Sequence, residues 1–267
     1  MNKKDIEIHE IKRPLISIII ATYNAGQLLD KAIASIISQS YVNYEVIVVD
    51  AKSTDDTMYY IEKNKNFISK FVSEPDKGIF DAWNKGVAMS SGDWVSFLGA
   101  GDEYTPDALM HYVEYILASS SELEFVSSKI DIVDESGNII MTKGSKWEWP
   151  KFLKFMNTPH VGSFHSRKLL DKYGKFNISY KVAGDYEFLM RPRNTLNAGF
   201  LDEITVKMLF GGISVTSLKD MHEGYRVKTE TGKMPIWLAK IDYYVAMFKA
   251  TIRAYFFKKG MYFTLRR

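Results

Sequence analysis

Short apolar runs alternate with segments of helical periodicity along the first half of the chain. The run Leu15–Thr22 is rich in β-branched residues and is flanked by turn residues, which predicts a buried strand. The next segment, Leu28–Ser38, repeats its apolar residues on one face of a helix. The same patterns predict further strands at Tyr44–Asp50, Ile68–Ser73, Trp94–Leu98 and Phe125–Val133, and further helices at Ile79–Met89 and from Pro106 to about Ser119.

Strand and helix therefore follow each other at the spacing of βαβ units. Such units place their strands parallel in one sheet and cover the sheet with the connecting helices. We expect an α/β fold built on a doubly wound, mostly parallel sheet flanked by helices. Past Gly144 the pattern loosens, because aromatic and basic residues mix and the loops lengthen.

The composition is that of a globular protein, with 46% apolar and 25% charged residues among 267. The absence of cysteine excludes a disulfide framework, a thiolate zinc site and a cysteine nucleophile. The N-terminus, Met1–Glu10, carries charges of both signs, and no plausible cleavage site follows the first apolar run. No apolar stretch approaches the ~18 residues that span a bilayer. We therefore expect a cytoplasmic protein.

The positive charge of the chain is concentrated at its C-terminus. The net charge is +3, yet six basic and no acidic residues follow Asp242, so the chain up to that residue is net negative. A basic, aromatic, amphipathic helix suits an anionic membrane surface, and a C-terminal helix docked on the domain with a solvated basic end is the alternative. No nucleic-acid motif is present. The helical spacing of apolar residues within Pro235–Phe257 is given by Ile241, Val245, Phe248, Ile252 and Tyr255 or Phe256.

Polar residues follow the predicted strands at the edge where open α/β sheets bind ligands. The first strand ends in Ala21-Thr-Tyr-Asn-Ala-Gly26, which is neither a dinucleotide-binding fingerprint nor a P-loop. Asp50, at the end of the second strand, is suited to accept hydrogen bonds from a base or a ribose, or to form a turn. Asp102, beyond the fourth strand, is either a turn residue or a ligand for a hard divalent cation.

Other polar residues have simpler structural explanations. Ser53, Asp55 and Asp56 form a capping-box pattern that opens the next helix. Lys77, ahead of the helix at Ile79–Met89, either pairs with a diphosphate or is solvated.

Five motifs in order resemble the family-2 glycosyltransferases, inverting enzymes of the GT-A fold, over about residues 14–215. The motifs are Ile18-Ile-Ile-Ala-Thr-Tyr-Asn24, Val48-Val-Asp50 with Ser53-Thr-Asp-Asp-Thr57, Ser73-Glu-Pro-Asp-Lys-Gly-Ile-Phe-Asp-Ala-Trp-Asn-Lys-Gly86, Gly92-Asp-Trp-Val-Ser-Phe-Leu98 and Gly101-Asp102.

The resemblance implies a role for each matching residue. Asp102 would hold Mg²⁺ or Mn²⁺ on the donor diphosphate, and Asp185 in Ala183-Gly-Asp-Tyr-Glu187 would be the general base. His160 would lie near the acceptor, although a lone histidine is as readily structural. Asp50 would hold the base, usually uracil. The remaining residues near the sugar nucleotide would be Thr22, Tyr23, Asn24, Lys77 and Asp81.

The chain departs from the family motif at one position. The acid expected directly before Asp102 is Gly101. A single-acid form occurs in a branch of the family, and one carboxylate leaves several metal positions to water and phosphate. Glu187 is a second candidate for the base, and Gly211-Gly-Ile-Ser214 resembles a loop that follows the base segment.

These expectations combine into one hypothesis. Residues 1–230 form a GT-A domain, with a nucleotide-sugar half at about 14–120 and an acceptor half at about 121–230, and residues 231–267 form the basic tail. The chain would transfer a hexose-type sugar, with inversion, from a UDP-linked donor to a glycan or lipid-linked acceptor of the cell surface. The missing acid at Gly101 motivates the alternative, a non-catalytic subunit that binds sugar nucleotides.

Overall fold

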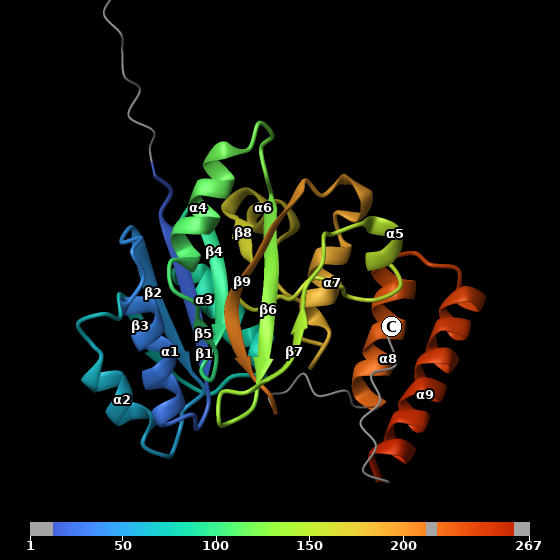
Figure 1. The fold of residues 1–267 in the computed structure, drawn as a ribbon, viewed down its shortest axis with the longest axis horizontal. Coiled ribbons are helices and arrows are strands. Elements are labelled where there is room, and N and C mark those ends of the chain that lie inside the picture. The colour runs from blue at the N-terminus through green and yellow to red at the C-terminus, as the bar shows by residue number, and fades with distance from the viewer. Residues whose placement is uncertain (1–12, 212–217, 259–267) are drawn as a thin grey trace, which may run out of the picture.

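A nine-stranded sheet forms the centre of the molecule, in the order β3-β2-β1-β4-β8-β6-β9-β5, with β7 paired to β6 (Figure 1). The structure, a computed structural model, describes residues 13–211 and 218–258. The N-terminal decapeptide, most of the segment Gly211–Ser214 and the basic residues after Lys258 lie outside these ranges. The strands are β1 (Ile16–Thr22), β2 (Tyr44–Asp50), β3 (Lys70–Ser73), β4 (Trp94–Gly99), β5 (Glu103–Tyr104), β6 (Phe125–Val133), β7 (Ile139–Lys143), β8 (Phe164–Ser166) and β9 (Ala198–Leu209).

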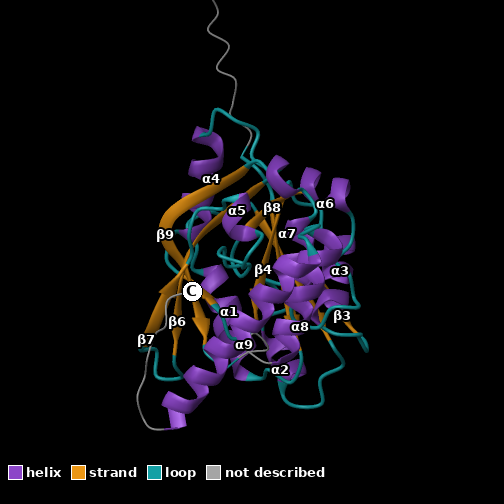
Figure 2. Cartoon of the chain, turned by 90° about the vertical axis from the view of Figure 1, so that its right-hand side faces the viewer, coloured by secondary structure: helices purple, strands orange, loops and turns teal. Residues whose placement is uncertain are grey.

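Helices cover both faces of this sheet (Figures 1 and 2). They are α1 (Gln27–Ile37), α2 (Thr57–Lys63), α3 (Ile79–Met89), α4 (Ala108–Ala118), α5 (Trp149–Phe152), α6 (Arg167–Tyr173), α7 (Gly184–Met190), α8 (Leu218–Arg226) and α9 (Ile236–Lys258), with short helical turns at Arg193–Thr195 and Val227–Thr231. The three predicted elements at residues 44–50, 79–89 and 125–133 have the observed bounds, and the other predicted ends differ by at most two residues.

The N-terminal half of the sheet is parallel, as predicted, and the other half is mixed. β1 pairs in parallel with both β2 and β4, and β2 pairs in parallel with β3. β8 then runs antiparallel to both β4 and β6, while β6 is parallel to β9. The expectation of a mostly parallel sheet thus holds only through β4, because the later strands are not linked by regular βαβ crossovers.

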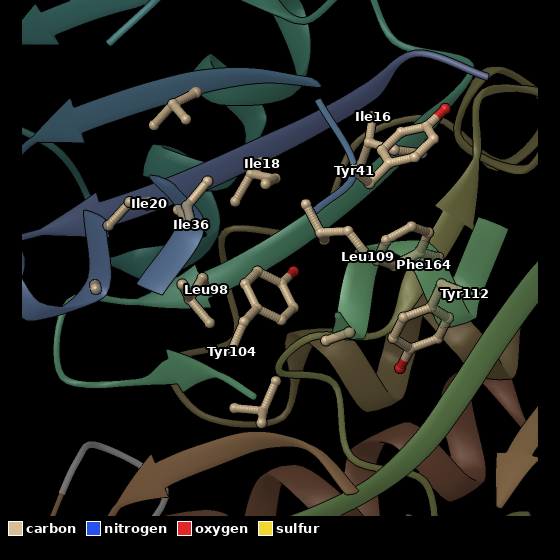
Figure 3. Close-up of a cluster of buried hydrophobic side chains, with 14 of the residues drawn as sticks. Ile16, Ile18, Ile20, Ile36, Tyr41, Leu98, Tyr104, Leu109, Tyr112 and Phe164 are labelled. Carbon is tan, nitrogen blue, oxygen red and sulfur yellow. The ribbon is translucent and has the colours of Figure 1, made fainter. Parts of the chain in front are cut away.

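Alternate residues of β1 supply two separate cores, one on each face of the sheet. Ile18 and Ile20 face α1 and α4, where they pack with Ile36 and Tyr112 in the cluster drawn in Figure 3. Ile19 faces the opposite side, with α3, α6 and α7. A strand buried on both faces has an unbroken apolar sequence, and this apolar run explains why the bounds of β1 could be predicted to within one residue.

Helix α3 approaches β1 more closely than a side chain would permit. A Cβ atom at Gly86 would lie 2.4 Å from Cγ2 of Ile19. The helix therefore lies directly against the sheet, and its N-terminus is held near the carboxyl ends of the strands.

The C-terminal helix α9 docks against the domain by one face only. Ala239 is fully buried, Tyr243 makes an edge contact with Tyr225 of α8, and Asp242 pairs with Lys228 at 3.3 Å. Figure 1 shows α8 and α9 side by side at one end of the molecule. Within residues 13–211 and 218–258, no helix is both long and apolar enough to cross a membrane. Exposed apolar side chains on the opposite face are Trp237, Ile241, Tyr244, Val245 and Phe248.

A pair of histidines is buried in the core beneath α3. The ring of His160 stacks on Trp83 with centroids 4.5 Å apart, and His165 lies 4.8 Å from it. Neither nitrogen of His160 has a hydrogen-bond partner among the described residues. Burial lowers the pKa of His165 from 6.5 to about 4 and holds the pKa of His160 well below its usual value. Both rings are therefore neutral at pH 7.

These histidines predict a loss of stability in acid. Below pH 6.5 the two histidines are protonated in the unfolded chain, whereas in the folded chain they stay neutral down to their lower pKa values. The unfolded state therefore binds more protons, and the free energy of unfolding falls as the pH falls. For His165 alone the loss between pH 7 and pH 5 is about 2 kcal/mol. His160→Phe retains the stacked ring and removes one titrating group, so we expect a shallower fall, measured as urea midpoints at both pH values.

The matched control for this experiment is His111→Phe. His111 is exposed on α4 and pairs with Glu203 at 2.6 Å, so its replacement leaves the buried pair intact. An unchanged pH slope in His160→Phe would contradict the assignment of acid sensitivity to the buried pair.

Candidate functional site

The carboxylate of Asp50 joins the carboxyl ends of β2 and β3. The side chain is fully buried. Its two oxygens accept hydrogen bonds from the hydroxyl and the backbone N–H of Ser53, the latter at 3.0 Å. Ser73, the last residue of β3, donates its hydroxyl to Oδ2 at 2.5 Å. A carboxylate oxygen can accept two hydrogen bonds, and Oδ1 accepts only that of the Ser53 hydroxyl among the described residues, so the predicted contact with a base is compatible with this network.

The loop after β1 is bonded to the loop after β2. The backbone N–H of Asn24 donates to Oγ of Ser53 at 2.8 Å, and Oδ1 of Asn24 accepts from the backbone N–H of Thr54 at 2.9 Å. The next two backbone N–H groups both donate to Oγ1 of Thr57 at 2.9 Å. The two loops therefore form one unit, centred on the buried Asp50.

The predicted capping box is wrong for Ser53. Helix α2 begins at Thr57, and Asp56 flanks it without a side-chain cap bond. Asp55 does accept the backbone N–H of Thr57 at 3.0 Å, as a capping residue would. Ser53 instead joins the two loops, a long-range role that the local spacing of residues does not reveal.

The three residues predicted to line a nucleotide pocket lie at the open end of β1. The hydroxyl of Thr22 is buried and has no hydrogen-bond partner among the described residues. Such a group costs about 1–3 kcal/mol unless a ligand or water satisfies it. Tyr23 is 64% exposed, and Asn24 has a positive φ of 47° that turns the chain. Their contact with a nucleotide stays a prediction.

Asp102 lies where β4 and β9 end. Its Oδ2 accepts the backbone N–H of Gly99 at 3.2 Å, and its Oδ1 accepts that of Leu209 at 3.1 Å. Burial raises the pKa of Asp102 to about 6, against the lowering effect of these two hydrogen bonds. Asp102 is thus a partly buried acid, and within the described residues its hydrogen bonds come from these two backbone groups.

The position before Asp102 has little room for a second acid. A Cβ atom at Gly101 would lie 3.2 Å from Cδ2 of Leu209 and 3.8 Å from Cδ1 of Leu28. The first of these distances is tighter than an ordinary contact, so an acidic side chain would require Leu209 to shift. The glycine that departs from the family motif thus lies close to the side chain of Leu209 on β9.

The residues at this edge fit a divalent cation held by one carboxylate. Among the described residues, no three His, Asp or Glu side chains converge on a metal position. The carboxylate of Asp102 is partly withdrawn from water, and such a group favours a bound cation electrostatically. Hard cations complete their shells with water and phosphate oxygens, which Asp102 alone leaves room for. The Mg²⁺ or Mn²⁺ site stays a prediction.

Lys77 and Asp81 lie together at the N-terminus of α3. Oδ2 of Asp81 accepts the backbone N–H of Lys77 at 3.0 Å, which makes Asp81 a local cap of the turn. The side chain of Lys77 is exposed, and its carbonyl accepts a hydrogen bond from Nζ of Lys181 at 2.5 Å. The β3–α3 loop is thereby tied to the segment that precedes Asp185.

Asp185 and Glu187 have different surroundings in the first turn of α7. Glu187 is buried and pairs with Arg191 at 2.6 Å, while its other oxygen accepts the hydroxyl of Thr231. These contacts make Glu187 structural. Asp185 is only partly buried, and its Oδ1 accepts the backbone N–H of Tyr186 at 2.8 Å. Of the two acids, Asp185 is the more exposed.

The N-terminus of α7 packs on that of α3. A Cβ atom at Gly184 would lie 2.7 Å from the ring of Phe80, so the neighbours of Asp81 and Asp185 are in contact. The structure thus brings the predicted base segment next to the predicted donor-side helix. His160, in contrast, is only 6% exposed beneath α3, a position inside the core rather than on an open acceptor surface.

The sequence patterns missed several residues of this edge. Ser53 and Ser73 hold Asp50, and Asn84 bonds both the N–H and the carbonyl of Phe176, at 2.8 and 2.9 Å. Ser73 carried a usable signal, because it is a hydroxyl at the very end of a strand. Asn84 carried none, since its partner lies 92 residues away.

The arrangement suits a phosphorylated, ring-containing ligand. Buried and exposed polar groups meet at the carboxyl ends of parallel strands, the usual ligand crevice of open α/β sheets. Asp102, the predicted cation ligand, lies at the ends of β4 and β9, and Asp185 lies in the first turn of α7. The pair has the types of group that a displacement with proton removal requires.

Comparison with known proteins identifies this architecture. The family model described as Glycosyl transferase family 2 matches residues 17–175. A PGL/p-HBAD biosynthesis glycosyltransferase of Mycobacterium bovis is 30% identical over 182 residues, which cover 67% of this chain and 69% of that protein.

Three solved structures share the fold. S. aureus TarS 1–349 in complex with UDP-GlcNAc has a TM-score of 0.64 at 19% identity, over 85% of this chain and 70% of that chain. A longer TarS chain is matched over 41% of its length. The mannosyltransferase PcManGT from Pyrobaculum calidifontis, in complex with GDP-Man and Mn²⁺, has a TM-score of 0.62 at 18% identity, over 88% and 71%. The fold is therefore GT-A, and the chain belongs to glycosyl transferase family 2.

Proposed function

We propose that this chain is an inverting hexosyltransferase that uses a nucleotide-diphosphate sugar, in particular a UDP-sugar. Its acceptor would be a glycan or a lipid-linked glycan in the synthesis of a cell-surface polysaccharide or glycolipid. The name of the mycobacterial relative, which refers to PGL/p-HBAD biosynthesis, supports the acceptor class. The UDP-GlcNAc complex of TarS supports the donor class.

The observation that carries the proposal is the polar edge around Asp50. Thr22, Tyr23 and Asn24 border the buried Asp50 carboxylate, and the two loops that contain them are joined by hydrogen bonds. A rigid edge of this kind binds a base and a ribose with little loss of conformational entropy. Lys77, exposed on the neighbouring loop, is placed to contribute positive charge toward a diphosphate.

Asp102 is the residue that would hold a divalent cation. When bound, the cation supplies charge that stabilises the departing diphosphate. Asp102 is fixed for this task by the backbone groups of Gly99 and Leu209, so its carboxylate needs no rearrangement.

Asp185 is the group that would remove the acceptor proton. Inversion is a direct displacement at the anomeric carbon, so a base must take the hydroxyl proton as the new bond forms. Two observations support Asp185 over Glu187: Asp185 is partly exposed and lies in the helix turn that packs on α3, whereas Glu187 is buried.

Asp185→Asn tests the catalytic assignment. The amide cannot accept a proton, so we expect transfer, or donor hydrolysis in a panel of nucleotide sugars, to fall about 100- to 10,000-fold. UDP binding by calorimetry should be unchanged, because Asp185 does not contact the base edge. Asp171→Asn, an exposed acid on α6, is the matched control. Near-normal turnover in Asp185→Asn would refute the assignment.

A non-catalytic sugar-nucleotide-binding subunit is the alternative, and the glycine at Gly101 is the observation that favours it. Such a subunit would bind UDP without dependence on metal and would hydrolyse no donor. The proposed transferase, which would hold its cation through Asp102, would instead bind UDP more tightly in the presence of metal.

Titration of UDP with and without Mn²⁺ separates the two functions. We expect Mn²⁺ to tighten UDP binding about 10- to 100-fold in the unaltered chain, and expect this effect to disappear in Asp102→Asn. Glu103→Gln, which changes the adjacent acid, should retain it. Binding that ignores Mn²⁺, together with no donor hydrolysis, would favour the non-catalytic subunit.

We further propose that the outer face of α9 contacts an anionic membrane, where a lipid-linked acceptor would be found. The exposed side chains of this face include Trp237 and Phe248, 66% and 67% exposed. Aromatic side chains of this kind settle at the boundary between lipid headgroups and acyl chains. The basic residues after Asp242 complement anionic lipids, and the cytoplasmic face is the side on which we expect this contact.

Co-sedimentation with lipid vesicles tests the membrane contact. The double variant Trp237→Ser/Phe248→Ser should bind vesicles containing phosphatidylglycerol at least about ten-fold more weakly, because two large apolar side chains are lost. The control, Tyr59→Ser/Phe67→Ser, removes exposed aromatic residues from α2 and the turn after it. Equal binding by both double variants would contradict the proposal, and raised salt should weaken binding of the unaltered chain.

A further inference from the structure

Three consecutive backbone N–H groups ahead of α7 converge on one side chain. Glu223, on α8, accepts the N–H of Lys181 through Oε1 at 2.7 Å. Its Oε2 accepts the N–H groups of Val182 and Ala183 at 2.8 and 2.9 Å. Glu223 is separated from these partners by about 40 residues, so the contact is tertiary. Both carboxylate oxygens are used on a single short segment.

The rest of α8 reinforces the same segment. The guanidinium of Arg226 lies 4.3 Å from the ring centroid of Tyr180, and its Nη2 donates to the hydroxyl of Ser179 at 3.3 Å. Tyr180 is itself buried. Residues 179–183 are thus held against α8 by hydrogen bonds and by a cation–π contact.

The segment held by Glu223 has two important neighbours. Asp185 follows Ala183 by two residues, in the first turn of α7. In the other direction, Nζ of Lys181 donates to the carbonyl of Lys77 at 2.5 Å, in the loop between β3 and α3. One carboxylate therefore fixes the backbone between the acid segment and the donor-side loop.

Hydrogen bonds to a charged acceptor are stronger than neutral ones and restrict the groups that make them. If the three N–H groups lost Glu223, the start of α7 would lose its only contacts of this kind from α8 within the described residues. A displacement of about 1 Å in a reacting group lowers the rate about 100-fold. The proposed function assigns donor binding mainly to Asp50 and Asp102, and Glu223 contacts neither of them within the described residues. Lys181 reaches the donor-side loop only at the backbone carbonyl of Lys77, so the Lys77 side chain keeps its freedom to meet a diphosphate.

We propose that Glu223 is a positioning residue that sets the location of Asp185 relative to the donor. It acts by holding residues 181–183, and Lys181 carries this constraint to the donor-side loop at Lys77. The inference rests on the proposed function, because it assigns to Asp185 the role of the base.

Glu223→Gln is the variant that tests this role. It retains the shape of the side chain and one acceptor oxygen but replaces the other oxygen with a donor that faces backbone N–H groups. Glu230→Gln is the matched control: Glu230 pairs with Arg226 at 3.2 Å and accepts the Tyr180 hydroxyl at 3.4 Å, which a glutamine oxygen can still accept, and no described contact joins it to residues 181–183. Both variants lose the same charge from the same part of the chain.

Two measurements are made on each variant. Hydrogen exchange of the peptide that contains residues 181–183 should be faster in Glu223→Gln and unchanged in Glu230→Gln. With the nucleotide sugar that the unaltered chain hydrolyses fastest, kcat should fall about 10- to 100-fold in Glu223→Gln, while UDP binding with Mn²⁺ changes less than about two-fold. A merely structural role would lower stability without separating kcat from binding.

The outcomes distinguish this inference from the proposed function. Unchanged exchange, or unchanged kcat with faster exchange, would overturn the role of Glu223 while the transferase activity stands. Equal losses of kcat and of UDP binding would also overturn it. If the unaltered chain hydrolyses no nucleotide sugar, the proposed function fails, and the role of Glu223 fails with it even when exchange is faster.

Discussion

The buried carboxylate of Asp50 is the interaction on which the ligand edge depends. Burying a carboxylate is unfavourable unless donors surround it, and here Ser53 and Ser73 supply them. Because Ser53 also accepts the backbone N–H of Asn24, the same carboxylate aligns the loops that follow β1 and β2. The exposed side chains at this edge are therefore attached to a rigid backbone. Rigid groups lose less conformational entropy when they bind a ligand.

Helix α3 connects this edge to residues 176 and 184 in the later part of the chain. Gly86 lets the helix lie against β1, Phe80 receives the close approach of Gly184, and Asn84 holds the backbone of Phe176. Segments that are about 100 residues apart in the sequence are thus held together by α3 and the loop before it. The acid in α7 and the polar edge around Asp50 are positioned through contacts with the same helix and its preceding loop.

Features set by local sequence pattern could be predicted from the sequence, and features set by tertiary contacts could not. Buried strands such as β2 and β6 were located closely, because an apolar run bounded by turn residues is a local property. The antiparallel entry of β8 was not predicted, since three residues contain no usable period. Candidate acids were found by their places after strands and in a family motif. Their supports, the Ser53 hydroxyl for Asp50 and the Leu209 backbone N–H for Asp102, depend on tertiary contacts that spacing does not encode.

The contact between Gly101 and Leu209 restricts how this site could change over evolution. A second acid at Gly101 would meet the side chain of Leu209, whose backbone N–H also holds Asp102. Gaining the acid therefore requires the Leu209 side chain to shift by a few tenths of an ångström, or a smaller residue in its place. The residue at this position of β9 thus influences how readily the site could come to carry two carboxylates.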